Sequence, residues 1–155
     1  MLHKIKTALI SVADKSNLSI ILEVLKKNNV KIISSGGTYN VIKKLGYTCT
    51  EVSSYTGFKE MLDGRVKTLH PKIHAGILHD RSNRKHSKEM NEQKFSSIDL
   101  IIVNFYPFQK VVTSSKSDKD IIDNIDIGGP TMVRAAAKNF RNVLIITSYS
   151  DYPDL

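Results

Sequence analysis

Apolar and amphipathic segments alternate over the first third of the chain, and this alternation constrains the fold more than any other feature. Residues 8–12 and 30–33 are β-rich apolar runs that predict buried strands. Between them, 17–28 carries leucine and isoleucine at helical spacing. A second helix is predicted to end at Lys44, and 47–52 predicts a third strand. The order β-α-β-α-β favours a parallel sheet with right-handed crossovers.

The rest of the chain extends the same pattern with less regular segments between the strands. Strands are predicted at 99–103 and 143–147, a short helix at Pro71 and a surface helix from about Ser87. Further interpretations are a loop over 111–117, a helix over 117–124, a loop and helix over 126–139, and a helix start at 150–153. We therefore predict a three-layer, doubly wound α/β fold with a mostly parallel sheet and helices on both faces, as one domain over 1–155.

Composition restricts the classes of partner. The chain has 23 Lys+Arg against 15 Asp+Glu, a net charge of +8, which favours an anionic ligand. The cationic cluster at Arg81, Arg84, Lys85 and Lys88 lacks interleaved aromatics, so it predicts a solvated face and no nucleic acid. No apolar run approaches the roughly 20 residues that span a bilayer. A single cysteine, Cys49, fits a reducing cytoplasm, and we expect a cytoplasmic protein.

The segment 126–139 combines paired glycines with a helix start. Gly128 and Gly129 permit backbone conformations that other residues avoid, and Pro130 suits the first helical turn. A helix N-terminus here would offer unsatisfied N–H groups to an anion. Arg134 and Lys138 share one helix face. Either an anion compensates these two cations, or they interact with the dipole at the helix C-terminus.

Polar residues follow several of the predicted strands, at the edge where open α/β sheets place their ligands. This edge would collect cations, hydroxyls and N–H donors, with Asp126 as the main carboxylate, and the segment 65–68 could fold across it. Such a mixture suits a phosphorylated substrate and proton-transfer chemistry. The predicted set is Asp14, Lys15, Ser35 to Thr38, Asn104, Tyr106 and Asp126 to Gly129.

Two other kinds of site are disfavoured. His70 and His74 have the i, i+4 spacing of a helical metal site, but no carboxylate or thiolate pattern completes it. We predict no metal, and local packing or hydrogen bonding for both histidines. Cys49 lies in a predicted strand and is interpreted as a small core residue. The glycine turn at 34–38 lacks the third spaced glycine of a dinucleotide fingerprint.

Six blocks of the chain carry a family resemblance. They are SVADK at 11–15, SGGT at 35–38, DGRVKTLHP at 63–71, NFYPF at 104–108, DIGGP at 126–130 and RAAAKN at 134–139. The chain resembles the N-terminal domain of bifunctional purine-biosynthesis enzymes, which combine AICAR transformylase with IMP cyclohydrolase. The resemblance implies a methylglyoxal-synthase-like fold and the dehydrative closure of formylaminoimidazole carboxamide ribotide to IMP, without a metal or redox cofactor.

The resemblance also implies site residues. Lys138 would be the acid/base residue, supported by Lys67, Tyr106 and Asp126. We expect Asp126 to orient the carboxamide N–H, the two lysines to protonate the departing oxygen, and Lys15 with the 35–38 turn to bind the 5′-phosphate. The implied ligand contacts are Ala13, Asp14, Lys15, Ser35, Gly36, Gly37, Thr38, Arg65, Val66, Lys67, Thr68, Val103, Asn104, Asp126, Ile127 and Gly128.

Two alternatives share this fold: a methylglyoxal synthase acting on a triose phosphate, and a non-catalytic effector-binding module like that of carbamoyl phosphate synthetase. The blocks at 63–71 and 126–130 favour the cyclohydrolase. We further expect that the chain is the N-terminal part of a longer enzyme whose folate-dependent transformylase domain lies outside these residues. A homodimer is expected for the parent enzyme and is one arrangement open to this chain.

Overall fold

A five-stranded sheet forms the centre of the computed structural model, which describes residues 4–114 and 117–155. Its order is β3-β2-β1-β4-β5, and every neighbouring pair is parallel. The predicted α/β fold is thereby confirmed. The strands are β1 (Thr7–Val12), β2 (Lys31–Ser34), β3 (Thr50–Glu51), β4 (Leu100–Asn104) and β5 (Leu144–Ile146).

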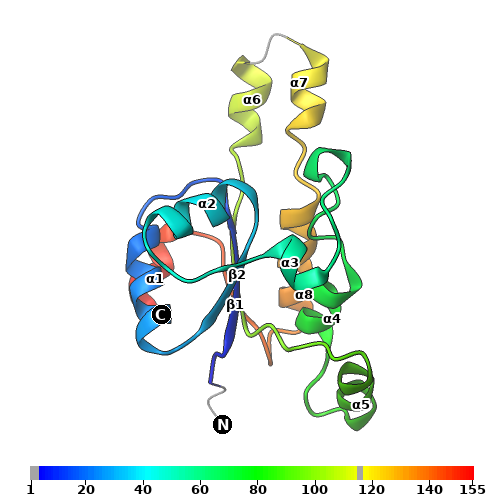
Figure 1. Cartoon of the computed structure of the whole chain (residues 1–155). Coiled ribbons are helices and arrows are strands. Elements are labelled where there is room, and N and C mark those ends of the chain that lie inside the picture. The colour runs from blue at the N-terminus through cyan, green and yellow to red at the C-terminus, as the bar shows by residue number, and fades with distance from the viewer. Residues whose placement is uncertain (1–3, 115–116) are drawn as a thin grey trace.

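Helices cover both faces of the sheet because β1 and β4 present apolar side chains alternately to each side. Ala8, Ile10 and Val12 pack with α1 (Leu18–Lys27), α2 (Gly36–Lys44) and the 3₁₀ segment η2 (Tyr149–Asp154). Leu9 packs on the opposite face, with α3 (Val52–Thr56), α4 (Pro71–Leu78) and α8 (Gly128–Lys138). Figure 1 shows these two helical layers on either side of the strands.

Four elements lie outside this sandwich: η1 (Leu62–Gly64), α5 (Arg84–Glu92), α6 (Phe108–Ser114) and α7 (Asp118–Asp123). α6 and α7 contact each other and project from the body at the top of Figure 1. Neither helix contains a buried residue. The predicted loop at 111–117 is wrong for 111–114, which are helical, and its residues 115–116 lie outside the described part of the chain.

Capping side chains explain two further differences from prediction. The expected strand over 47–52 is reduced to two residues, because the Glu51 carboxylate accepts the Ser53 N–H at 2.5 Å and α3 begins at Val52. Helix α5 starts three residues before Ser87, because the Asn83 side chain accepts the N–H groups of Lys85 (2.9 Å) and His86 (3.3 Å).

Arg81 corrects the prediction of a wholly solvated cationic cluster. Its side chain is only 19% exposed and lies 2.7 Å from the carboxylate of Asp99, which is 7% exposed. Lys85 and Lys88 are exposed as predicted and face Glu89 and Glu92 one helical turn on. Within the described residues, no helix is both long and apolar enough to cross a membrane.

Candidate active site

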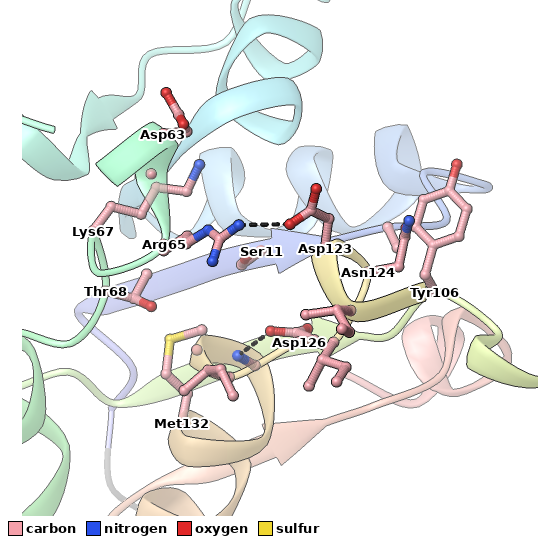
Figure 2. Close-up of a pocket in the computed structure, with 17 residues that line it drawn as sticks. Ser11, Asp63, Arg65, Lys67, Thr68, Tyr106, Asp123, Asn124, Asp126 and Met132 are labelled. Carbon is pink, nitrogen blue, oxygen red and sulfur yellow. Dashed lines mark hydrogen bonds and ion pairs between the residues drawn. The ribbon is translucent and has the colours of Figure 1, made fainter. Parts of the chain in front are cut away.

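A cavity of about 540 Å³ lies beyond the carboxyl ends of β1 and β4 (Figure 2). Figure 2 shows Arg65, Lys67 and Thr68 on one side and Asp123, Asn124 and Tyr106 on the other. The lining includes nine predicted site residues: Ala13, Arg65, Lys67, Thr68, Tyr106, Asp126, Ile127, Gly128 and Gly129. The loop 62–69 therefore folds across the sheet edge, as the sequence predicted.

The N-terminus of α8 forms the floor of this cavity, and its two glycines are required by space. A Cβ on Gly128 would lie 2.4 Å from Thr68 Oγ1, and one on Gly129 would lie 2.5 Å from Asp126 Oδ2. Neither glycine has a positive φ. The predicted need for an unusual backbone conformation is thus wrong here, and close approach is the reason for glycine.

Asp126 places its carboxylate at the start of α8. Its Oδ1 accepts the N–H of Gly129 at 2.9 Å, and the residue stays exposed. One N–H of the helix terminus is thereby satisfied, as in an ordinary N-terminal cap. Pro130 has no N–H, and Thr131 donates its N–H to the Ile127 carbonyl at 3.3 Å. Among the described residues, the start of α8 therefore presents one acceptor, Asp126 Oδ2, and one donor, the Gly128 N–H, that are free of such bonds.

Two cations of the loop 62–69 are paired with carboxylates. The Arg65 guanidinium donates to Asp123 at 2.5 Å, and the Lys67 ammonium lies 3.7 Å from Glu60. Lys67 is half-buried, whereas Arg65 is largely exposed. Because these pairs remain in contact with water, each adds little to stability, and their main effect is to orient the side chains.

Lys67 and Lys15 both approach the N-terminus of α2. A Cβ on Gly36 would lie 3.0 Å from Lys67 Nζ, and a Cβ on Gly37 would lie 3.8 Å from Lys15 Nζ. Gly36 has φ +54°, a conformation that favours glycine. Lys15 Nζ also donates to the carbonyls of Val12 (3.3 Å) and Ala13 (3.1 Å). Two ammonium groups at a helix N-terminus form a site that attracts anions strongly.

Several predicted contact residues hold the site together through their own side chains. The Thr38 hydroxyl is buried, donates to the Val12 carbonyl (2.9 Å) and accepts the Val12 N–H (3.1 Å). Asn104 bridges both backbone groups of Asp14, at 2.9 and 2.8 Å. Val103 is buried in the core, which leaves only its backbone for a ligand. Hydrogen bonds from Ser16 lower the pKa of Asp14.

Lys138 does not line the cavity. It is the last residue of α8, ten residues after Gly128, which corresponds to about 15 Å along the helix. There it lines a separate groove with His74 and Arg134. The expectation that Lys138 converges with Lys67 and Asp126 is therefore not met within the single chain.

His70 and His74 have structural partners. His70 Nδ1 caps α4 by accepting the Lys72 N–H at 3.1 Å. Burial lowers the pKa of His74, while a hydrogen bond with the Thr68 backbone acts in the opposite direction. Across 4–114 and 117–155, no three His, Cys, Asp or Glu side chains group as metal ligands would.

The sequence prediction missed part of the lining. The additional residues are Ser11, Asp63, Gly64, Ile122, Asp123, Asn124, Ile125 and Met132. Asp63 and Gly64 belong to the block at 63–71 that carries the family resemblance, so that block could have identified them. Asp123 gives no local signal, because its role depends on an arginine 58 positions earlier.

The chain is an open α/β domain that gathers cations and two helix N-termini at the carboxyl edge of its sheet, the place where proteins of this fold class bind their ligands. The MGS-like domain family matches residues 18–131, and the chain belongs to this family. A solved structure described as ForH is 30% identical, covers 97% of this chain and 77% of its own, and superposes with a TM-score of 0.84.

The chain is also similar to curated proteins that carry a specific name. Proteins named bifunctional purine biosynthesis protein PurH are similar to the chain in Oceanobacillus iheyensis (53% identity over 95% of this chain) and in Acetivibrio thermocellus (49% over 96%). The chain spans 29% of the length of each relative.

Proposed function

We propose that this chain closes the second ring of inosine monophosphate from the formylated aminoimidazole carboxamide ribotide. The observation that carries the proposal is one cavity lined by Lys67, Tyr106, Asp126 and the N-terminus of α8. Beside it, Lys15 and Lys67 form an anion-attracting site at the N-terminus of α2. The relatives' printed names, which refer to purine biosynthesis, support the same reaction.

The 5′-phosphate is assigned to the N-terminus of α2. Lys15 and Lys67 supply two positive charges there, and the N–H groups of the first helical turn point toward an anion in that position. Thr38 contributes by fixing α2 to β1, since its hydroxyl is already bonded on both sides. The base then extends toward Asp126 and the start of α8.

The reaction needs a proton acceptor and a place for developing negative charge. The carboxamide nitrogen attacks the formyl carbon and loses a proton, for which the Asp126 carboxylate is the acceptor in the cavity. The formyl oxygen gains charge, and the Gly128 N–H at the start of α8 and the Lys67 ammonium stabilise it. That oxygen takes up two protons and leaves as water, with Lys67 or the exposed Tyr106 hydroxyl as the donor. The formamido nitrogen loses its proton at the same time, and the C=N bond of the new ring forms as the C–O bond breaks.

We also propose the acid/base role that the resemblance implies for Lys138, provided that its ammonium can reach the cavity. Its ammonium lies on the far half of α8, so it reaches a ligand in the cavity only if a second copy of the chain brings it there. A homodimer is accordingly part of the proposal.

The reaction forms one C–N bond, transfers protons and releases water, with no change of oxidation state. We therefore assign this domain no metal or redox cofactor. A folate would serve a transformylase domain outside these residues, and we place the reaction in the cytoplasm. We propose no nucleic-acid or membrane partner.

The deciding experiment supplies the formylated ribotide to the purified chain and follows inosine monophosphate by its absorbance. Turnover above the uncatalysed rate is expected. Dihydroxyacetone phosphate is offered in parallel, and methylglyoxal formation would favour the synthase alternative. Binding of the ribotide without turnover would favour the effector module.

A further inference from the structure

A second cavity, of about 780 Å³, lies at the opposite edge of the sheet, where β1 and β2 begin. Lys4 and Lys6 reach it from the segment before β1, Lys31 from the first position of β2, and Arg81 from the loop after α4. Lys6 and Lys31 are neighbours, because the Lys31 N–H donates to the Lys6 carbonyl at 2.8 Å. Four cations therefore surround one space.

In the described part of the chain, one carboxylate lines this cavity, that of Asp99, and both of its oxygens already have partners. Asp99 Oδ2 accepts the N–H groups of Lys6 (2.7 Å) and Thr7 (2.9 Å), and Oδ1 lies 2.7 Å from Arg81. Within the described residues, no acidic side chain lies within 4 Å of the three lysine ammonium groups. The cavity thus retains an uncompensated positive charge, which attracts anions.

The remaining walls offer neutral donors and one aromatic ring. Ser96 and Ser97 bring hydroxyl groups, of which that of Ser97 is already hydrogen-bonded to His79 Nε2 at 3.2 Å. Asn29 brings an amide, and Phe95 lines the same space. Arg81 Nε has no acceptor among the described residues, but it is buried and out of a ligand's reach, so Arg81 contributes charge to the cavity wall. Several cations, hydroxyls and a ring match an anion with more than one phosphate and a flat base.

We propose that this cavity binds a polyphosphate nucleotide, of the nucleoside di- or triphosphate class. The ligand differs from the ribotide of the proposed function, which carries one phosphate, and it binds at the other end of β1 and β4. The site would join the starts of β1 and β2 to the Arg81 loop. A bound nucleotide therefore stabilises the folded chain.

The experiment measures binding of ATP to the full chain by calorimetry and by the shift of the unfolding midpoint. One ATP per chain is expected, with AMP about tenfold weaker because fewer charges are engaged. Lys6→Gln with Lys31→Gln should weaken ATP binding by about fivefold or more, an effect that added salt reduces.

Two matched variants locate the site. Lys43→Gln with Lys44→Gln removes the same charge from the end of α2, and Lys15→Gln with Lys67→Gln removes the amines at the first cavity. Both should bind ATP as the unmodified chain does. The proposal is overturned if ATP does not bind, if Lys43→Gln with Lys44→Gln weakens binding equally, or if Lys15→Gln with Lys67→Gln abolishes it. None of these results depends on ring-closing activity.

Discussion

Arg65 and Asp123, which are 58 positions apart in the chain, meet at 2.5 Å across the mouth of the candidate active site. One belongs to the loop that folds over the sheet edge and the other to the end of α7 (Figure 2). The pair therefore connects the projecting helices to the site.

Breaking this pair should affect ligand binding more than stability. The side chains are 65% and 40% exposed, so Arg65→Ala, Asp123→Ala and the double variant should reveal a coupling of less than about 1 kcal/mol in urea unfolding. KM for the ribotide should rise several-fold in each single variant, because the loop over the cavity loses its anchor. A coupling well above that range would contradict the assignment.

Lys67→Ala should lower the rate of ring closure by about 10²-fold, the usual effect of removing one donor to a developing negative charge. The folded structure should persist, since the one ion pair of Lys67 among the described residues is the long one with Glu60, at 3.7 Å. Lys59→Ala, in the same loop region and exposed, is the control and should turn over normally. Steady-state kinetics with circular dichroism would check both, and an active Lys67→Ala would remove the lysine from the mechanism.

Gly128→Ala should destabilise the fold by about 1–3 kcal/mol, because its Cβ would overlap the buried Thr68 hydroxyl. Thr68→Ala removes that oxygen. The double variant should therefore recover part of the loss, and urea unfolding of all four proteins gives the coupling. Additive effects would show that the two residues are not in conflict.

Lys138→Ala should lose ring-closing activity with its fold intact if the implied acid/base role holds. Because Lys138 lies outside the cavity of its own chain, this role requires transfer between copies. Mixtures of Lys138→Ala and Lys67→Ala chains should then regain activity through hybrid dimers that hold one intact site. If Lys138→Ala is fully active, the role is refuted. If Lys138→Ala is inactive and its mixture with Lys67→Ala gains no activity, the proposal that two copies of the chain share one site is refuted.

Cys49 should resist alkylation. Burial raises the pKa of its thiol to about 11, above the ordinary value of 9.0, so the reactive thiolate is scarce near pH 8. Iodoacetamide should react at least about tenfold more slowly with the folded chain than with the denatured chain. The reaction rate should increase as the pH approaches 11, and equal rates at pH 8 would contradict the burial.

The sequence by itself determined the order of the five strands and of the helices between them other than α3 and α6, because apolar periodicity and turn residues act over a few positions. It also predicted Lys67, Tyr106 and Asp126 as site residues, since they fall in blocks with a specific resemblance. Tyr106 reaches the cavity because it follows β4, whose carboxyl end shares an edge with that of β1, whereas Lys67 arrives on the loop 62–69 and Asp126 on the segment between α7 and α8.

Only the tertiary structure decided which charged side chains are paired and where Lys138 lies. Arg81 looks like its solvated neighbours in sequence, yet it packs against Asp99 because the loop after α4 passes the start of β4. Lys138 is close to Asp126 in sequence, but α8 separates them by its own length. Such relationships depend on how elements cross in space, and no local pattern records that crossing.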